Sequence, residues 1–153
     1  MSTFSARANS KCLLTLVAQT LLCVPFAVAA AEPTWSDEDR KNLAYLFESQ
    51  RTNMSAHLLV KPTMQQVSPE TVQEMIALNT RALMQARLVR DDVLAKMHPL
   101  LPSVFRTVYE TSFELFLESV SEENDEKSRR SAALHGQWVE WWDSNRSEFQ
   151  VPK

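Results

Sequence analysis

The chain has 153 residues, with 16 basic and 19 acidic side chains, one glycine, seven prolines and two cysteines. A single glycine excludes glycine-rich phosphate loops, dinucleotide fingerprints and nucleophile elbows, and it disfavours a β-rich fold, whose turns need several glycines. The net charge of −3 argues against nucleic acid as a partner.

The first 31 residues have the three parts of a secretory signal peptide. Arg7 and Lys11 precede an apolar segment that ends in a run of small residues. We expect cleavage after Ala29 or Ala31, which the mass of the mature protein would show, and a periplasmic or secreted product without a stable membrane span. Both cysteines leave with the signal, so disulfides and cysteine–metal sites are excluded. The mature chain keeps 14 basic and 19 acidic residues, a net charge of −5.

Capping residues and prolines divide the mature chain, 32–153, into helical lengths. Ser36 is followed by three acidic residues, and Ser68 is followed by Pro69 and Glu70, so both serines are typical helix caps. Pro99 and Pro102 mark a corner, because the residue before a proline is pushed out of the helical region. We expect helices over residues 37–60, 69–97, 102–121 and 128–149. Four amphipathic helices with short connections predict an all-α fold, a single four-helix antiparallel bundle with up-down-up-down topology.

Polar residues interrupt the apolar faces of the first two predicted helices. The first helix gathers Leu43, Leu46, Phe47, Met54 and Leu58 on one face, together with Gln50 and His57. Asn79 and Arg90 fall near the middle of the apolar stripe of the second helix. Polar residues in such stripes either find partners in the core or form a site.

The register of the first two helices predicts two polar pairs. An antiparallel pairing across the connection at 61–68 places Gln50 opposite Asn79 and Asp39 opposite Arg90. A buried unpaired charge costs several kcal/mol, so we expect Arg90 to reach Asp39 or another carboxylate. We also expect an amide hydrogen bond between Gln50 and Asn79.

Two surfaces are candidates for binding another protein. Glu110, Glu114 and Glu118 recur at every fourth position of the third predicted helix and line one side of it. They form a strip for a cationic partner, a weak calcium site or a solvated face. Trp141 and Trp142 form either an aromatic anchor for a partner or part of the core.

Metal and haem chemistry have little support in the sequence. The three histidines, His57, His98 and His135, do not belong to a motif that places two ligands on one helical face. A haem alternative would use Met54 or His57 together with His135 as axial ligands. We predict no metal site and no cofactor.

These observations lead to one functional hypothesis and two alternatives. The first is a non-catalytic exported module that binds another extracytoplasmic protein, such as an envelope adaptor, chaperone-like factor or inhibitor. The second is a binder of a small anionic ligand, or a minor enzyme, in which Arg90 holds the anion and Gln50, His57 and Asn79 orient it. The third is a haem- or metal-binding bundle. We expect no enzyme activity, because no catalytic motif is present.

Overall fold

The computed structural model describes residues 32–59 and 67–152, and in these ranges the chain is all-helical, without strands. The predicted signal peptide lies outside the described residues. No helix within them combines the length and the apolar character needed to cross a bilayer.

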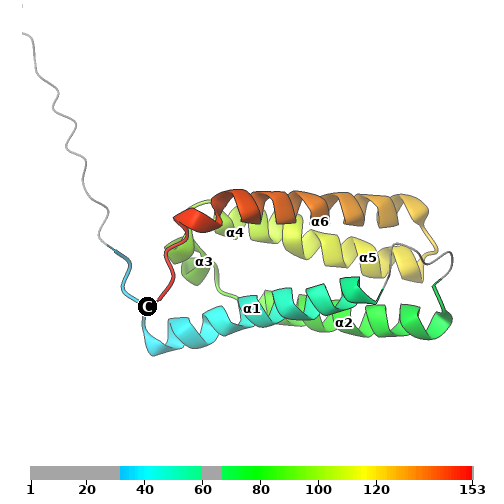
Figure 1. Cartoon of the computed structure of the whole chain (residues 1–153), viewed down its shortest axis with the longest axis horizontal. Helices are drawn as coiled ribbons and strands as arrows, with labels where there is room; N and C mark the ends of the chain where they lie inside the picture. Colours follow the sequence, from blue (N-terminus) through cyan, green and yellow to red (C-terminus); the bar gives the residue numbers. More distant parts are fainter. Residues whose placement is uncertain (1–31, 60–66, 153) are drawn as a thin grey trace, which may run out of the picture. The chain divides into compact units, whose positions relative to one another are not determined.

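The chain runs through a series of helices and two shorter helical segments. Their bounds are α1 Asp37–Leu58, α2 Pro69–Leu88, α3 Asp91–Met97, α4 Leu101–Val104, the π-helical η1 Phe105–Glu110, α5 Thr111–Ser121, α6 Asp125–Asn145 and the 3₁₀ turn η2 Arg146–Glu148. Helix α1 lies along α2, and α5 lies along α6 (Figure 1). The core between them is strongly aromatic, with the fully buried Phe105 and Tyr109 beside Trp138.

The predicted caps start α1 and α2 where the sequence places them. The Ser36 side chain accepts a hydrogen bond from Asp39 N at 3.1 Å, and Asp39 Oδ2 accepts one from Ser36 N at 3.0 Å, which completes a capping box. Ser68 caps α2 through Thr71 N, with Pro69 in the first turn.

The single helix predicted over 69–97 is wrong, because the chain breaks between α2 and α3. Val89 and Arg90 have extended backbone, with ψ angles of 127° and 143°. The buried Asn42 of α1 bridges this break: its Nδ2 donates to Leu88 O and its Oδ1 accepts from Arg90 N, each at 2.8 Å. One amide side chain thus replaces the hydrogen bonds that a continuous helix would have made.

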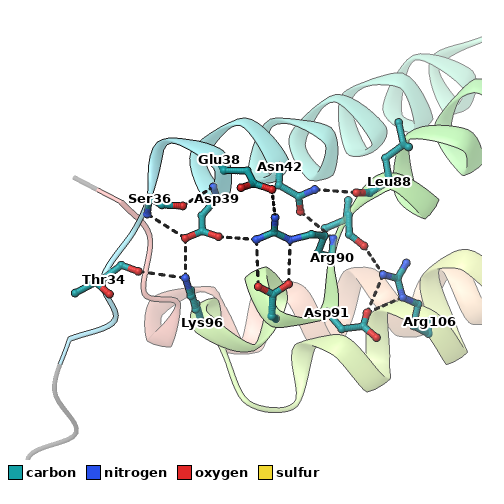
Figure 2. A network of polar contacts seen from close by, with 12 residues as sticks. Thr34, Ser36, Glu38, Asp39, Asn42, Leu88, Arg90, Asp91, Lys96 and Arg106 are labelled. Atoms are coloured by element: carbon teal, nitrogen blue, oxygen red, sulfur yellow. Dashed lines mark hydrogen bonds and ion pairs between the residues drawn. The ribbon is translucent and has the colours of Figure 1, made fainter.

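Further side chains stabilise the same break (Figure 2). Arg106 donates to Ala86 O at 3.2 Å and to Val89 O, so carbonyl groups of the last turn of α2 are bonded to a cation. Asp91 and Asp92 then begin α3, where negative charge suits the helix dipole.

The predicted bounds of the third and fourth helices need smaller corrections. Residues 101–121 are helical throughout, but η1 inserts a π-helical turn that the hydrophobic pattern does not reveal. Helix α6 begins at Asp125 rather than at residue 128, because the Asn124 side chain caps it by accepting from Glu126 N and Lys127 N. It ends at Asn145, where the 3₁₀ turn η2 takes over.

Helix α1 packs with a mainly polar face, which corrects the predicted apolar one. Leu43 and Leu46 are buried as expected, but Phe47, Met54 and Leu58 are 45%, 66% and 74% exposed. Five of the eight buried residues of α1 are polar: Asp39, Asn42, Ser49, Thr52 and Asn53. The inner surface of α1 therefore depends on hydrogen bonds as much as on apolar contact.

Replacing Asn42 with alanine should destabilise the fold, because Leu88 O and Arg90 N would lose the buried side chain that bonds both of them. We expect a loss of about 2–4 kcal/mol in the free energy of unfolding, measured by urea denaturation. Asn145→Ala is the control, since that amide makes one hydrogen bond to Trp141 O of its own helix. Equal losses in the two variants would show that the bridge has no special role.

Candidate functional site

A cavity of about 340 Å³ lies between α1, η1 and α6. Helix α1 lines it with Gln50, Asn53, Met54 and His57. Helix α6 lines it with His135, Trp138, Val139, Trp142 and Asp143, and η1 contributes Tyr109. The cavity thus joins polar groups of α1 to aromatic and apolar walls, the composition typical of small-molecule sites.

Two amide groups of α1 are incompletely bonded at this cavity. Within the described part of the chain, Gln50 Nε2 and Asn53 Oδ1 are the buried side-chain nitrogen and oxygen atoms without a hydrogen-bond partner. Asn53 is 4% exposed, and its Nδ2 lies 3.3 Å from His135 Nδ1. A buried unpaired polar group costs about 1–3 kcal/mol, so these two atoms set the cavity apart from the rest of the interior.

Two histidines form a stacked pair in the wall of the cavity. The rings of His57 and His135 have centroids 4.1 Å apart and planes inclined by 27°. Burial lowers the pKa of His57, and burial together with the charge of His57 lowers the pKa of His135 to about 4. Both rings are therefore neutral at pH 7.

Tyr109 of η1 lines the cavity, and its hydroxyl group is bonded within the core. The side chain is fully buried, and its hydroxyl lies 3.1 Å from Ser49 Oγ, which donates to Ala82 O at 2.8 Å. Burial raises the pKa of this phenol well above its usual range. Its ring packs on Trp138 with centroids 4.6 Å apart and planes inclined by 35°.

The structure separates the four residues that the sequence assigned to one ligand site. Gln50 and His57 line the cavity, whereas Asn79 lines a second, smaller pocket of about 200 Å³ that shares His57 and His135 with the first. The predicted hydrogen bond between Gln50 and Asn79 is wrong. Asn79 Nδ2 donates instead to Met75 O of its own helix at 2.8 Å.

Arg90 lies at the other end of α1, in an ion-pair network. It contacts Asp39 at 2.8 Å, Glu38 at 2.6 Å and Asp92 at 3.1 Å, so the structure brings together the predicted pair Asp39 and Arg90 (Figure 2). Asp39 also accepts from Lys96 at 2.6 Å, and this bond is the main cause of its strongly lowered pKa. Asp39 precedes Gln50 by eleven residues, about 16 Å along a helix. Arg90 and the cavity are therefore separate features.

The glutamates proposed as a strip for a cationic partner have cationic neighbours in the chain. Glu110 pairs with Arg106, Glu114 with Arg87 at 2.7 Å, and Glu118 with Lys127 at 2.6 Å. Burial raises the pKa of Glu110, which is consistent with its place against the core. These ion pairs within the chain therefore neutralise most of the negative charge of the strip.

The two tryptophans proposed as an anchor pack against the aromatic core. Trp141 contacts His98 edge-on, with centroids 5.5 Å apart, and Trp142 contacts Phe149 at 4.7 Å. Both rings are half-buried. Trp142 is also a wall of the cavity, which gives it a role that its place in the sequence did not reveal.

The geometry is unsuited to His57 and His135 as a pair of axial haem ligands; the pairing of Met54 with His135 stays a prediction. An iron between two imidazoles needs ring nitrogens directed at it from opposite sides, whereas His57 and His135 lie face to face. In the described ranges, no group of three or more histidine, cysteine or acidic side chains is arranged to hold a metal ion.

Asn53 is one of the cavity residues that the sequence did not predict. It was not assigned to the inner face of its helix, although Gln50, Asn53 and His57 are spaced three and four residues apart and so share one face. Tyr109 and Val139 were also missed, because only the packing of η1 and α6 brings them to α1.

No protein-family model matches this chain, and neither a curated protein sequence nor a solved structure matches it.

Acid should destabilise the protein through the stacked histidines. In the unfolded chain a histidine has a pKa near 6.5, so the unfolded state takes up the proton first. The stability that the neutral histidines contribute is fully present above about pH 6.5, and it is lost as the pH falls towards 4. Allowing for partial exposure of the rings, we expect a loss of about 1–2 kcal/mol between pH 7 and pH 4.5, measured by urea denaturation.

The variant His135→Gln is the comparison for this measurement. It should lose less than about half as much over the same interval, because only His57 remains to be protonated. Subtracting one pH profile from the other removes the contribution of the carboxylates, which both proteins share. Among them is Glu110, whose raised pKa makes acid stabilising rather than destabilising. Identical pH profiles would contradict the role given to the stack.

Proposed function

We propose that this protein binds a small uncharged molecule in the cavity between α1, η1 and α6, without transforming it. The observation that supports this proposal is the pair of unbonded amide atoms, Gln50 Nε2 and Asn53 Oδ1, buried beside an aromatic-walled cavity. The volume of about 340 Å³ falls in the usual range for ligand pockets.

The charge of the lining favours an uncharged ligand over the anion considered from the sequence. Arg90, which would have held an anion, is paired with three carboxylates away from the cavity. Both histidines are kept neutral by burial. The charged residue among those lining the cavity is Asp143, which is 59% exposed and lies 3.7 Å from Arg146.

Binding suits these residues better than catalysis does. Among the lining residues, the Tyr109 hydroxyl is turned to Ser49, and His135 Nδ1 lies against the Asn53 amide rather than against a carboxylate that would orient the ring as a base. The two surfaces predicted to bind a partner already make contacts within the chain. The glutamates form ion pairs, and the two tryptophans pack against the core. Protein binding therefore stays a prediction, and ligand binding is the function that we favour.

The frame that we propose for this site is the antiparallel four-helix bundle, with α4, η1 and α5 acting together as its third helix. Hydrogen bonds from Asn42 to Leu88 and from Ser49 to Ala82 support the antiparallel pairing of α1 with α2. The signal-peptide pattern of residues 1–31 supports a place of action outside the cytoplasm.

Uncharged one-ring aromatic compounds, such as phenol and toluene, test this function. In a titration of ¹⁵N-labelled protein, we expect the largest shifts at residues 50–57 and 135–143. Val139→Trp adds a large side chain to the cavity wall and should weaken binding at least about tenfold. Ala133→Trp, on an exposed position of the same helix, should leave binding unchanged.

The proposal fails if no such compound produces localised shifts. It also fails if the two tryptophan variants bind equally well, because the compounds would then occupy another surface.

A further inference from the structure

One face of α1 carries large apolar side chains that lie exposed. Phe47, Met54 and Leu58 follow one another at spacings of seven and four residues, so they share one face of the helix. Arg51 belongs to the same face, and its side chain is 76% exposed. Large apolar residues that gather on one exposed face are typical of a surface that another molecule covers.

The single glycine of the chain lies on the neighbouring helix, α6, close to this face. Gly136 comes between Ala132 and Val139, and those two residues line the pockets that α6 shares with α1. Its φ angle is not positive, and a methyl group added there would have nothing within 4 Å in the described part of the chain, its own stretch of helix aside. Glycine inside a helix costs about 0.5–1 kcal/mol relative to alanine. One copy of the fold has no use for this open space, and a neighbouring molecule could fill it.

The stacked histidines fix the level of α1 relative to α6. The two helices run in opposite directions (Figure 1), and His57 of α1 stacks on His135 of α6. We can therefore count one residue back on α1 for each residue forward on α6. By this count Gly136 is level with residue 56, which lies between Met54 and Leu58. Residue 140 is level with residue 52, next to Arg51 in the chain.

We propose that the protein forms a homodimer in which α1 of each copy packs on α6 of the other copy. The twofold axis runs parallel to the helices, so it exchanges the copies without moving either along the bundle. Met54 and Leu58 of one copy then lie over Gly136 of the other, and Arg51 lies beside Glu140. Both copies use the same patch, as a closed twofold dimer requires. Met54 also lines the ligand cavity, so the second copy covers one side of it.

Charge favours the same arrangement. Glu140 is exposed and has no ion-pair partner among the described residues. Asp143, one turn further along α6, is 59% exposed and lies 3.7 Å from Arg146. The Arg51 side chain pairs with Glu48 of its own helix at an exposed position, where such pairs contribute little. In the dimer the guanidinium group of one copy faces acidic side chains of the other.

The other twofold arrangement, α1 on α1 and α6 on α6, is less complementary. It sets large apolar side chains against large ones, and it leaves the acidic residues of α6 facing α6 of the second copy. The pairing of α1 with α6 is the one that uses both the open space at Gly136 and the opposite charges.

Gly136→Gln separates the dimer from the fold of one copy. The space around Gly136 is open in a single copy, and glutamine forms helix better than glycine does, so the melting temperature of dilute, monomeric protein should stay equal or rise. In the dimer the new side chain meets Met54 and Leu58. We expect the dissociation constant of the dimer, measured by sedimentation equilibrium, to rise at least about tenfold. Ser144→Gln places the same side chain at an exposed position on a different face of α6 and should leave that constant unchanged.

A charge exchange tests the predicted neighbours. Arg51→Glu and Glu140→Arg should each raise the dissociation constant about fivefold, because like charges then face each other across the interface. The double variant should return to within about twofold of the unchanged protein, since the pair is restored with its signs exchanged.

Three results would overturn the dimer. The first is a monomer at all concentrations up to about 100 μM. The second is a dimer whose dissociation constant does not respond to Gly136→Gln, because the copies would then meet through another surface. The third is a double variant as weak as the single ones. Ligand binding is measured separately, so none of these results bears on the proposed function.

Discussion

Helix α1 turns a mainly polar face to the interior, and each polar group buried there needs a partner. Asp39 is bonded to Arg90 and Lys96, Asn42 to both sides of the break after α2, and Ser49 to Ala82 and Tyr109. Thr52 donates to Glu48 O and lies 3.1 Å from the side-chain oxygen of Gln85. Because unpaired groups cost free energy in a water-poor interior, these bonds determine how α1 sits on its neighbours.

The two parts of α1 differ in how completely their buried polar groups are bonded. At the N-terminal part, Asp39 and Arg90 close the structure with a charged network that also secures the break between α2 and α3. Further along, Gln50 and Asn53 leave one donor and one acceptor unpaired, and both residues line the cavity together with Trp138. Buried polar groups without a partner are expected at a site where a ligand supplies the missing hydrogen bonds.

Much of the helical structure follows from local signals, and the site does not. Ser36, Ser68 and Pro69 mark helix starts that depend on neighbouring residues, and the pairing of Asp39 with Arg90 follows from an antiparallel register. The break at Val89 carries no proline or glycine. It is stabilised by Asn42 and Arg106, from distant parts of the chain, so no local pattern could reveal it. The bond between Asn53 and His135 likewise depends on how α6 packs against α1.

The stability of one conservative variant tests the central claim most directly, namely that the Gln50 donor is kept unpaired for a ligand. An unbonded buried amide costs stability that an apolar side chain of the same length does not. In the absence of ligand, Gln50→Met should therefore raise the free energy of unfolding by about 0.5–1 kcal/mol, measured by urea denaturation. Thr52→Val, which removes a bonded hydroxyl, should lower it by about 1 kcal/mol. A similar loss of stability in Gln50→Met would show that this amide is already satisfied, and it would contradict the account.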